Sequence, residues 1–150
     1  MMWRFAQKGP NVEVSLESLD SREIGSALMM QEAEVGFVRS DVQQASMQQE
    51  RVARVPMVCV VPKGHPLTRL DAVRVQDLSR TPLVLLGWRR AARRDVDLAF
   101  QTAGIAQDVV AEAHSVATAC GRVAAGLGLS IVNGLLMREC LHPDVQVRPF

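Results

Sequence analysis

The 150-residue chain lacks the long apolar runs of membrane proteins and the basic excess of nucleic-acid-binding proteins. No apolar stretch approaches the length of a transmembrane helix, and the N-terminus has no secretory apolar core. Seventeen Lys and Arg residues stand against sixteen Asp and Glu, so the net charge of +1 gives no drive toward nucleic acid. We therefore expect a cytoplasmic protein that contacts no membrane.

Cysteine is also scarce. The three residues, Cys59, Cys120 and Cys140, are odd in number and form no C-x-x-C pair. All three lie among apolar neighbours, so we interpret them as small core residues in a reducing compartment. The three histidines are scattered as well. We therefore expect neither a metal site nor a cofactor.

The chain is rich in apolar residues, which make up 48% of it and predict a real core. The central stretch is Ser115–Asn133, whose apolar residues from Val116 onward recur at helical spacing. Ser115 is a typical N-cap, and Gly126 and Gly128 end the helix because glycine accepts a positive φ. A short buried strand then follows, and the small residues at the turn let helix and strand approach closely.

The remaining elements alternate along the chain. We expect a half-buried strand at 11–17, a helix starting at Asp20 or Ser21, a strand at 33–38 and a polar surface connection at 39–54. Residues 1–9 have the spacing of a short helix end. Later strands are expected at 55–62, 82–87, 108–113, 129–132 and 145–149, with helices near 96–103 and 135–140. After residue 81 strands and helices alternate regularly, which predicts right-handed βαβ units and a mostly parallel sheet.

Two segments resemble the effector-binding domain of LysR-type transcriptional regulators. VAAGLGLSIVN is similar to the family's V-x-x-G-x-G-x-x-x-x-P segment, with Asn133 where many members carry proline. VVPKGHPL is similar to the segment v-x-p-x-x-H-P-L, where the family's chain crosses between lobes. The resemblance extends over residues 1–150 and implies an α/β, two-lobe, periplasmic-binding-protein-like fold of type 2.

The resemblance also implies a division of the chain. Residues 1–54 correspond to a partial first lobe, 55–62 to a crossover strand, 63–142 to a complete second lobe and 143–150 to the returning crossover strand. The family's helix-turn-helix and part of its first lobe have no counterpart, so we expect a truncated chain, from a gene fragment or a misassigned start upstream of Met1.

Ligands of two-lobe α/β proteins bind between the lobes, at strand ends and helix starts, where free N–H groups favour an anion. Three helix starts fit this role, and the family's effector contacts come from the same places. The candidate ligand-binding residues are Leu19, Asp20, Ser21, Trp88, Arg89, Arg90, Ser115, Val116, Thr118 and Asn133.

Several of these candidates also have a structural interpretation. Ser21 and Ser115 are typical N-caps, and Asp20 is a cap whose charge would repel a carboxylate. Thr118, in a first helical turn, often bonds back to a carbonyl. His65, in the His-Pro-Leu turn, is most simply structural.

Four arginines crowd one predicted helix start, namely Arg89, Arg90, Arg93 and Arg94. Cations are mildly unfavourable at a helix N-terminus, which suggests a compensating anion. One interpretation is a solvated basic face lying over Trp88. The other is that Arg89 or Arg90 binds an acidic effector through a bidentate fork.

The leading hypothesis is the effector-sensing domain of a LysR-type regulator, which binds a small organic or amino acid between two lobes to control transcription. The resemblance implies a homodimer or tetramer in the full-length family, with DNA contacted only through a helix-turn-helix. We expect that the protein is not an enzyme, because the sequence shows no nucleophile–base pair. The alternatives are a solute-binding protein of the same fold, a small enzyme using the arginines and His114, or a non-functional fragment.

Overall fold

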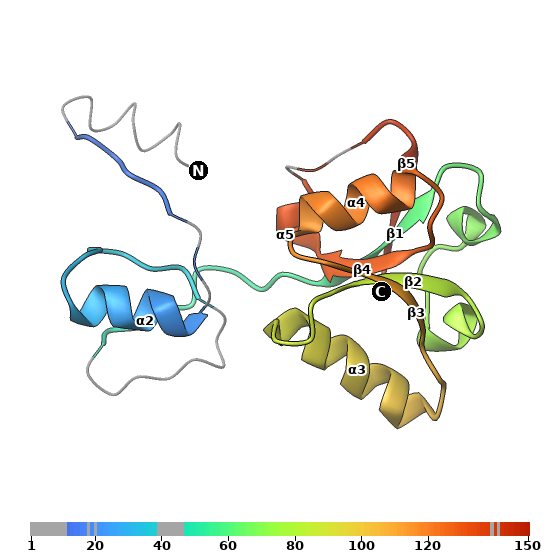
Figure 1. Cartoon of the computed structure of the whole chain (residues 1–150), viewed down its shortest axis with the longest axis horizontal. Coiled ribbons are helices and arrows are strands. Elements are labelled where there is room, and N and C mark those ends of the chain that lie inside the picture. The colour runs from blue at the N-terminus through green and yellow to red at the C-terminus, as the bar shows by residue number, and fades with distance from the viewer. Residues whose placement is uncertain (1–11, 18, 20, 39–46, 139, 141) are drawn as a thin grey trace. The chain divides into compact units, whose positions relative to one another are not determined.

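The computed structural model describes residues 12–17, 19, 21–38, 47–138, 140 and 142–150. The chain divides into two compact units, Met1–Arg51 and Val52–Phe150, each described here by itself (Figure 1). The first unit contains α2 (Ser21–Met29), which begins where the sequence predicts a helix. None of the helices among the described residues combines the length and the apolar character needed to cross a membrane.

In the first unit, residues after α2 pack back onto that helix. Gly36 lies so close that an added Cβ would come within 2.6 Å of Ile24 Cγ2 and 3.0 Å of Leu28 Cδ1. Only glycine, which has no Cβ, permits this approach without displacement. The contact gives α2 an apolar neighbour within its own unit.

The strands predicted at 11–17 and 33–38 are wrong over their described residues. Residues 12–17 and 33–38 have no strand structure, and the side chains of Val12 and Phe37 are 54% and 59% exposed. An alternating apolar pattern makes a strand only when a second backbone supplies the ladder hydrogen bonds. The described part of this unit provides no such partner. The predicted helix end at 1–9, and residues 39–46 of the predicted connection, lie outside the described residues.

The second unit is built on five strands in two hydrogen-bonded groups. They are β1 (Met57–Pro62), β2 (Pro82–Leu86), β3 (Asp108–Ala113), β4 (Ser130–Asn133) and β5 (Val145–Pro149). One group has the order β4-β1-β5 and the other is β2-β3. A parallel bridge between Leu83 and Leu129 joins them, because Val84 N donates to Leu129 O at 2.7 Å and Leu129 N donates to Pro82 O at 2.9 Å.

The parallel arrangement predicted for the strands after residue 81 is confirmed. Strands β3 and β4 are parallel to β2, and β5 runs in the same direction as β4, because both are antiparallel to β1. Strand β1 runs antiparallel to both β4 and β5. The connection from β1 to β2 contains two short 3-10 helices, η1 (Pro66–Arg69) and η2 (Val75–Leu78).

Strands β1 and β5, from the two segments expected to be crossover strands, lie side by side. Cys59 of β1 lies opposite Arg148 of β5, and Val61 lies opposite Gln146. The ends of the unit are also joined, since Phe150 N donates to Met57 O at 3.2 Å. The segment that enters the unit and the segment that leaves it therefore meet at one place.

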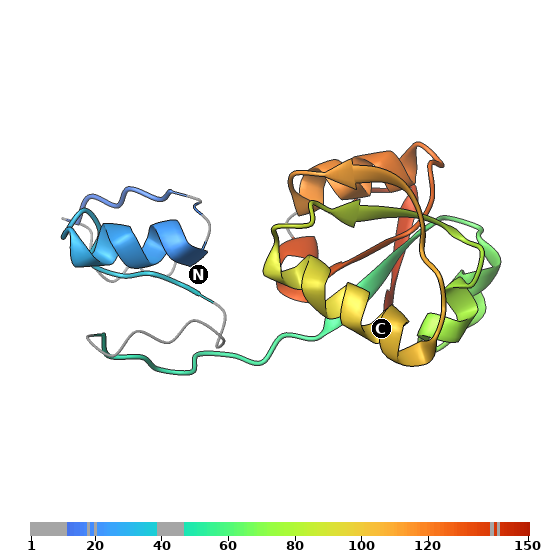
Figure 2. The same ribbon diagram turned by 60° about the horizontal axis from the view of Figure 1, so that its bottom comes forward.

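Helices cover both faces of the sheet (Figures 1 and 2). Helix α4 (Val116–Ala124) and the short α5 (Gly134–Met137) pack on one face, and α3 (Ala91–Ala103) packs on the other. The strands alternate between the two cores, as Cys59 faces the α3 side and Val60 the α4 side. The sheet is therefore buried on both faces, as expected for an α/β unit.

The predicted start and end of the central helix are confirmed. Ser115 Oγ accepts a hydrogen bond from Thr118 N at 3.1 Å, as an N-cap should. Gly126 and Gly128 follow the helix with φ values of 80° and 154°. At Gly128 an added Cβ would lie 2.4 Å from Pro82 O, so glycine allows the turn to approach β2.

Replacing Gly128 by alanine should therefore destabilise the protein by about 1–3 kcal/mol, since the new methyl group meets a backbone carbonyl that cannot rotate away. Urea unfolding measures this change. The control is Gly121→Ala within α4, where an added Cβ meets nothing within 4 Å. That substitution should stabilise the helix by up to about 1 kcal/mol. Equal effects of the two variants would contradict the close approach.

The burial of Cys59 has a measurable consequence. Its side chain is fully buried, and this desolvation raises the pKa of the thiol from 9.0 to about 12. Above pH 9 the unfolded chain loses this proton while the folded chain keeps it. The free energy of unfolding must then fall as the pH rises from 9 toward 12.

We expect Cys59→Ala to reduce this decline by about 1.4 kcal/mol per pH unit, the value of one differentially bound proton. Urea unfolding of both proteins at several alkaline pH values measures the slope. The chain is suited to the test because it has no tyrosine and only two lysines. Identical slopes would mean that Cys59 ionises in the folded protein as it does in the unfolded one.

Candidate functional site

Three parallel strands of the second unit end at the same edge of the sheet. Leu86 of β2 lies opposite Ala113 of β3, and Gly87 N extends the ladder by donating to Ala113 O at 3.1 Å. Strand β4 runs parallel to β2 and ends at Asn133. Seven predicted site residues lie at these strand ends or just after them: Trp88, Arg89, Arg90, Ser115, Val116, Thr118 and Asn133. We call this set the strand-end edge.

The loop after β2 brings two arginines to the strand-end edge. The guanidinium of Arg89 lies over the Trp88 ring, 4.9 Å from its centroid, and the Trp88 side chain is 64% exposed. Arg90 Nη2 donates across to His114 O at 3.4 Å and so links the loops after β2 and β3. Arg90 is also the N-cap of α3, but its side chain makes no capping hydrogen bond. The predicted basic face over Trp88 is thus observed for Arg89.

The loop after β3 places two hydroxyl groups together. Ser115 Oγ lies 3.0 Å from Thr118 Oγ1, and both residues are exposed. Val116, in contrast, is only 6% exposed because its side chain joins the core beneath α4. A ligand at the start of α4 could therefore reach the hydroxyl groups and the backbone N–H of Val116, but not its side chain.

Asn133 caps the short helix that follows β4. Its Oδ1 accepts hydrogen bonds from Leu135 N at 2.9 Å and from Leu136 N at 3.4 Å. The amide nitrogen of the side chain is a donor and takes no part in this cap. The residue is therefore structural through its oxygen, and only its nitrogen can serve a ligand.

The other three candidates belong to the first unit. Leu19 is partly buried, Ser21 is the first residue of α2, and Asp20 lies outside the described residues. Their role in ligand binding stays a prediction.

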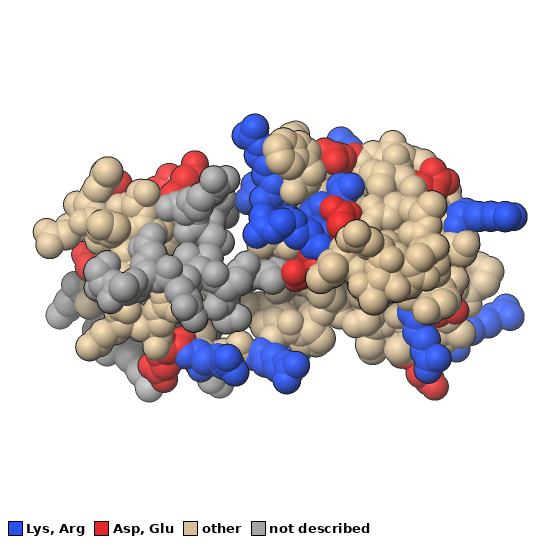
Figure 3. All heavy atoms as spheres, turned by 90° about the horizontal axis from the view of Figure 1, so that it is seen from below, with Lys and Arg blue, Asp and Glu red and all other residues tan. Residues whose placement is uncertain are grey.

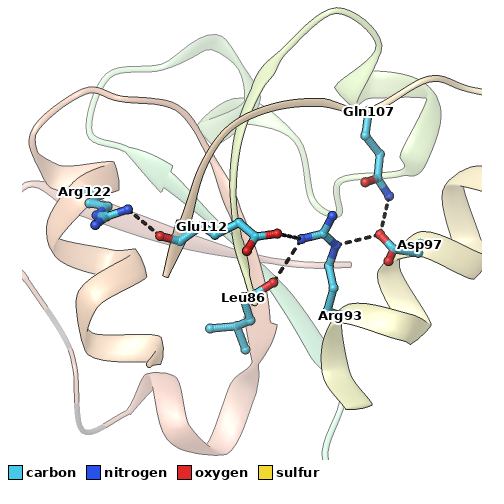
Figure 4. Close-up of polar contacts among 6 residues, drawn as sticks. All are labelled: Leu86, Arg93, Asp97, Gln107, Glu112 and Arg122. Carbon is cyan, nitrogen blue, oxygen red and sulfur yellow. Dashed lines mark hydrogen bonds and ion pairs between the residues drawn. The ribbon is translucent and has the colours of Figure 1, made fainter. Parts of the chain in front are cut away.

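Arg93 has a structural role that the sequence did not reveal (Figure 4). Its side chain is 12% exposed and donates to Asp97 Oδ1 at 2.7 Å, to Glu112 Oε1 at 3.1 Å and to Leu86 O at 3.1 Å. Arg93 thus ties α3 to the ends of β2 and β3. Asp97, Glu112 and the Leu86 carbonyl therefore take up the guanidinium of Arg93, whereas Arg89 lies over Trp88 and Arg90 bonds to the His114 carbonyl.

Two neighbours extend the Arg93 network. Gln107 Nε2 donates to Asp97 Oδ1 at 2.9 Å, and Arg122 of α4 donates to the backbone oxygen of Glu112 (Figure 4). The Arg93–Asp97 pair has the i,i+4 spacing that a sequence can suggest. Glu112 lies 19 residues away from Arg93, so only the fold brings them together.

Lys and Arg side chains form a cluster over the beginning of α3, with few acidic side chains among them (Figure 3). Among the described residues, no three His, Cys, Asp or Glu side chains lie close enough together to hold a metal ion. A groove of about 440 Å³ lies at the other end of the sheet, between Ser79 and Arg80 on one side and residues 104–108 on the other. It includes none of the predicted site residues.

The sequence profile of the LysR substrate binding domain matches residues 1–150. The chain belongs to this family. Its fold is the α/β, periplasmic-binding-protein-like fold of LysR effector-binding domains, as expected. The transcriptional activator protein LysR of Escherichia coli is 25% identical over 146 residues, which cover 97% of this chain and 47% of that protein. The chain thus spans about half the length of the curated relatives it matches.

Solved structures agree on the fold. The BenM effector binding domain with its effector benzoate has a TM-score of 0.81 and 20% identity, covering 99% of this chain and 68% of that one. Full-length CbnR complexed with its target DNA has a TM-score of 0.82 and 20% identity, covering 99% of this chain and 53% of that one.

The substitution Arg93→Met should lower the free energy of unfolding by about 1–3 kcal/mol, because it leaves Glu112 and the Leu86 carbonyl without their charged donor. Methionine keeps the apolar stem of the side chain. Arg69→Met on the exposed η1 helix is the control and should change stability by less than about 0.5 kcal/mol. Chemical denaturation measures both variants, and equal effects would remove Arg93 from its proposed structural role.

Proposed function

We propose that this chain is the effector-sensing domain of a LysR-type transcriptional regulator and that its strand-end edge binds a small acidic effector. The observation that carries the proposal is the convergence of two helix starts with Arg89 and Arg90 at the ends of three parallel strands. In open α/β sheets, this is the edge at which ligands bind.

The chemistry of the edge suits a carboxylate. The N-terminus of α3 has no side-chain cap, so its first N–H groups and the helix dipole can stabilise an anion. Within the described part of the chain, the Arg90 side chain makes one long hydrogen bond, to a carbonyl oxygen, and this bond can be exchanged for a stronger one to a carboxylate. The hydroxyl groups of Ser115 and Thr118 and the amide nitrogen of Asn133 supply further donors.

The relatives support the same ligand class and role. BenM, which shares the fold, binds benzoate, a small aromatic carboxylate, and CbnR was solved on DNA. We propose that effector binding shifts the orientation of such a domain, and that a DNA-binding part of the whole regulator responds to the shift. The assembly would be a homodimer or tetramer in the cytoplasm. Its action would be regulatory and not enzymatic.

The test is a calorimetric titration of the chain with benzoate and a panel of small organic and amino acids. We expect Arg89→Ala/Arg90→Ala to weaken binding of the best acid at least about tenfold, since a charge-assisted hydrogen bond contributes more than 1.4 kcal/mol. Arg69→Ala, on η1, is the matched control and should bind as the unchanged protein does.

The uncharged amide of the same acid provides a second control. The amide should bind the unchanged chain more weakly than the acid does. The double variant should bind the amide as weakly as the unchanged chain does, because the amide has no charge for the arginines to recognise. If the double variant retains full affinity for the acid, the two arginines do not form the site. If no acid in the panel raises the melting temperature or releases heat, the strand-end edge is not an anion site.

A further inference from the structure

Residues 12–17 of the first unit, VEVSLE, present a row of backbone groups without hydrogen-bond partners, and we call them the open segment. The trace of this segment does not coil (Figures 1 and 2). Among the described residues, no hydrogen bond involves a backbone N–H or C=O of the open segment. Such a row of unpaired groups is a template on which another extended chain can form a ladder.

The side chains of the open segment have the pattern of a strand. Val12, Val14 and Leu16 alternate with polar residues, so an extended backbone places the three apolar side chains on one face. All three are exposed, Leu16 by 75%. The segment contains no lysine and no proline, the residues with which natural edge strands prevent pairing. An apolar face and a free backbone are thus present without a block against a partner.

Residues 33–38 are a weaker candidate for the same role. Val35 is 72% exposed, but Gly36 packs against Ile24 and Leu28 of α2. A glycine inside a strand weakens it, because it has no side chain to pack and loses more conformational entropy than other residues. The open segment is therefore better suited to pairing.

We propose that the open segment pairs in antiparallel fashion with the open segment of a second copy of this chain. The two-fold axis of the pair passes through Val14, which lies opposite its own counterpart. Val12 then lies opposite Leu16, so apolar side chains meet on one face. On the other face Glu13 lies opposite Ser15. Each copy contributes the same residues, as in an isologous dimer interface.

The charges of the open segment select this register. With the axis at Ser15, Glu13 would lie opposite Glu17, and with the axis at Glu13 that residue would lie opposite itself. A parallel pair in register would place both glutamates opposite their counterparts. Like charges directly opposite each other destabilise a strand pair. An axis between two residues would bring apolar side chains opposite polar ones. The segment is thus complementary to itself about Val14, which identifies a second copy as the partner.

The expected dimer is weak and depends on concentration, because a ribbon of two strands is only marginally stable in water. Its interface lies in the first unit, whereas the strand-end edge belongs to the second unit. The pairing therefore stands independently of the proposed effector site.

The experiment is sedimentation equilibrium of the 150-residue chain over a range of concentrations. We expect a monomer–dimer equilibrium, which Val14→Lys should weaken more than about tenfold, because two ammonium groups then meet at the axis and an apolar contact is lost. Val35→Lys is the matched control. It makes the same change at another exposed valine of the first unit and should leave the equilibrium unchanged.

Two further variants test the register itself. Ser15→Lys places an ammonium group opposite Glu13 on both sides of the axis, and Ser15→Glu places a carboxylate there. We expect the first to strengthen the dimer and the second to weaken it, each by about two- to thirtyfold, since a cross-strand charge pair occurs twice. The Ser15 side chain is exposed, so neither variant disturbs packing. Circular dichroism checks that both are folded.

Hydrogen exchange locates the contact. The amides of the open segment should exchange more slowly as the protein concentration rises. A chain that stays monomeric throughout, or a dimer that protects only amides of the second unit, would overturn the proposal. Equal dimerisation of Ser15→Lys and Ser15→Glu would do the same, and so would a loss of dimer in Val35→Lys as large as that in Val14→Lys.

Discussion

The approach of Gly128 to the Pro82 carbonyl is the contact on which the architecture of the second unit depends. It brings Leu129 within hydrogen-bonding distance of β2, and those bonds join the group β2-β3 to the group β4-β1-β5. The joined strands form one sheet with a helix on each face. Because β2, β3 and β4 are parallel across this junction, their carboxyl ends share an edge, and the proposed effector site exists only because they do.

Much of the second unit could be predicted from local sequence. The spacing of apolar residues, the cap at Ser115 and the glycines after α4 are short-range signals, and each marks an element that the structure contains. The direction of β1 could not be found in this way, because it depends on pairing with β4 and β5, which lie far from β1 in the sequence. The strands expected near Val12 and Phe37 failed for a related reason. Alternation records which face of a strand would be buried, but not whether a partner strand is there.

For the candidate site, too, the sequence predicted some features and missed others. Its positions followed from strand ends and helix starts, and seven of the ten candidates come together at one edge. The roles of individual side chains could not be predicted from the sequence, because these roles depend on contacts between elements that are distant in the chain. Arg93 belongs to the sequence cluster that suggested an anion site, yet Glu112 and Asp97 use its charge to hold α3 in place. Cys120 and Met137 are likewise neighbours only in space.

The hydrogen bond between Phe150 and Met57 brings the two ends of the second unit together. A piece of chain whose two ends meet can be inserted into a surface loop of another protein without forcing the host's strands apart. Because β1 and β5 are hydrogen-bonded side by side, a bend in one of these strands is shared by the other. A unit of this kind can therefore be inserted into different proteins during evolution while its own sheet stays unchanged.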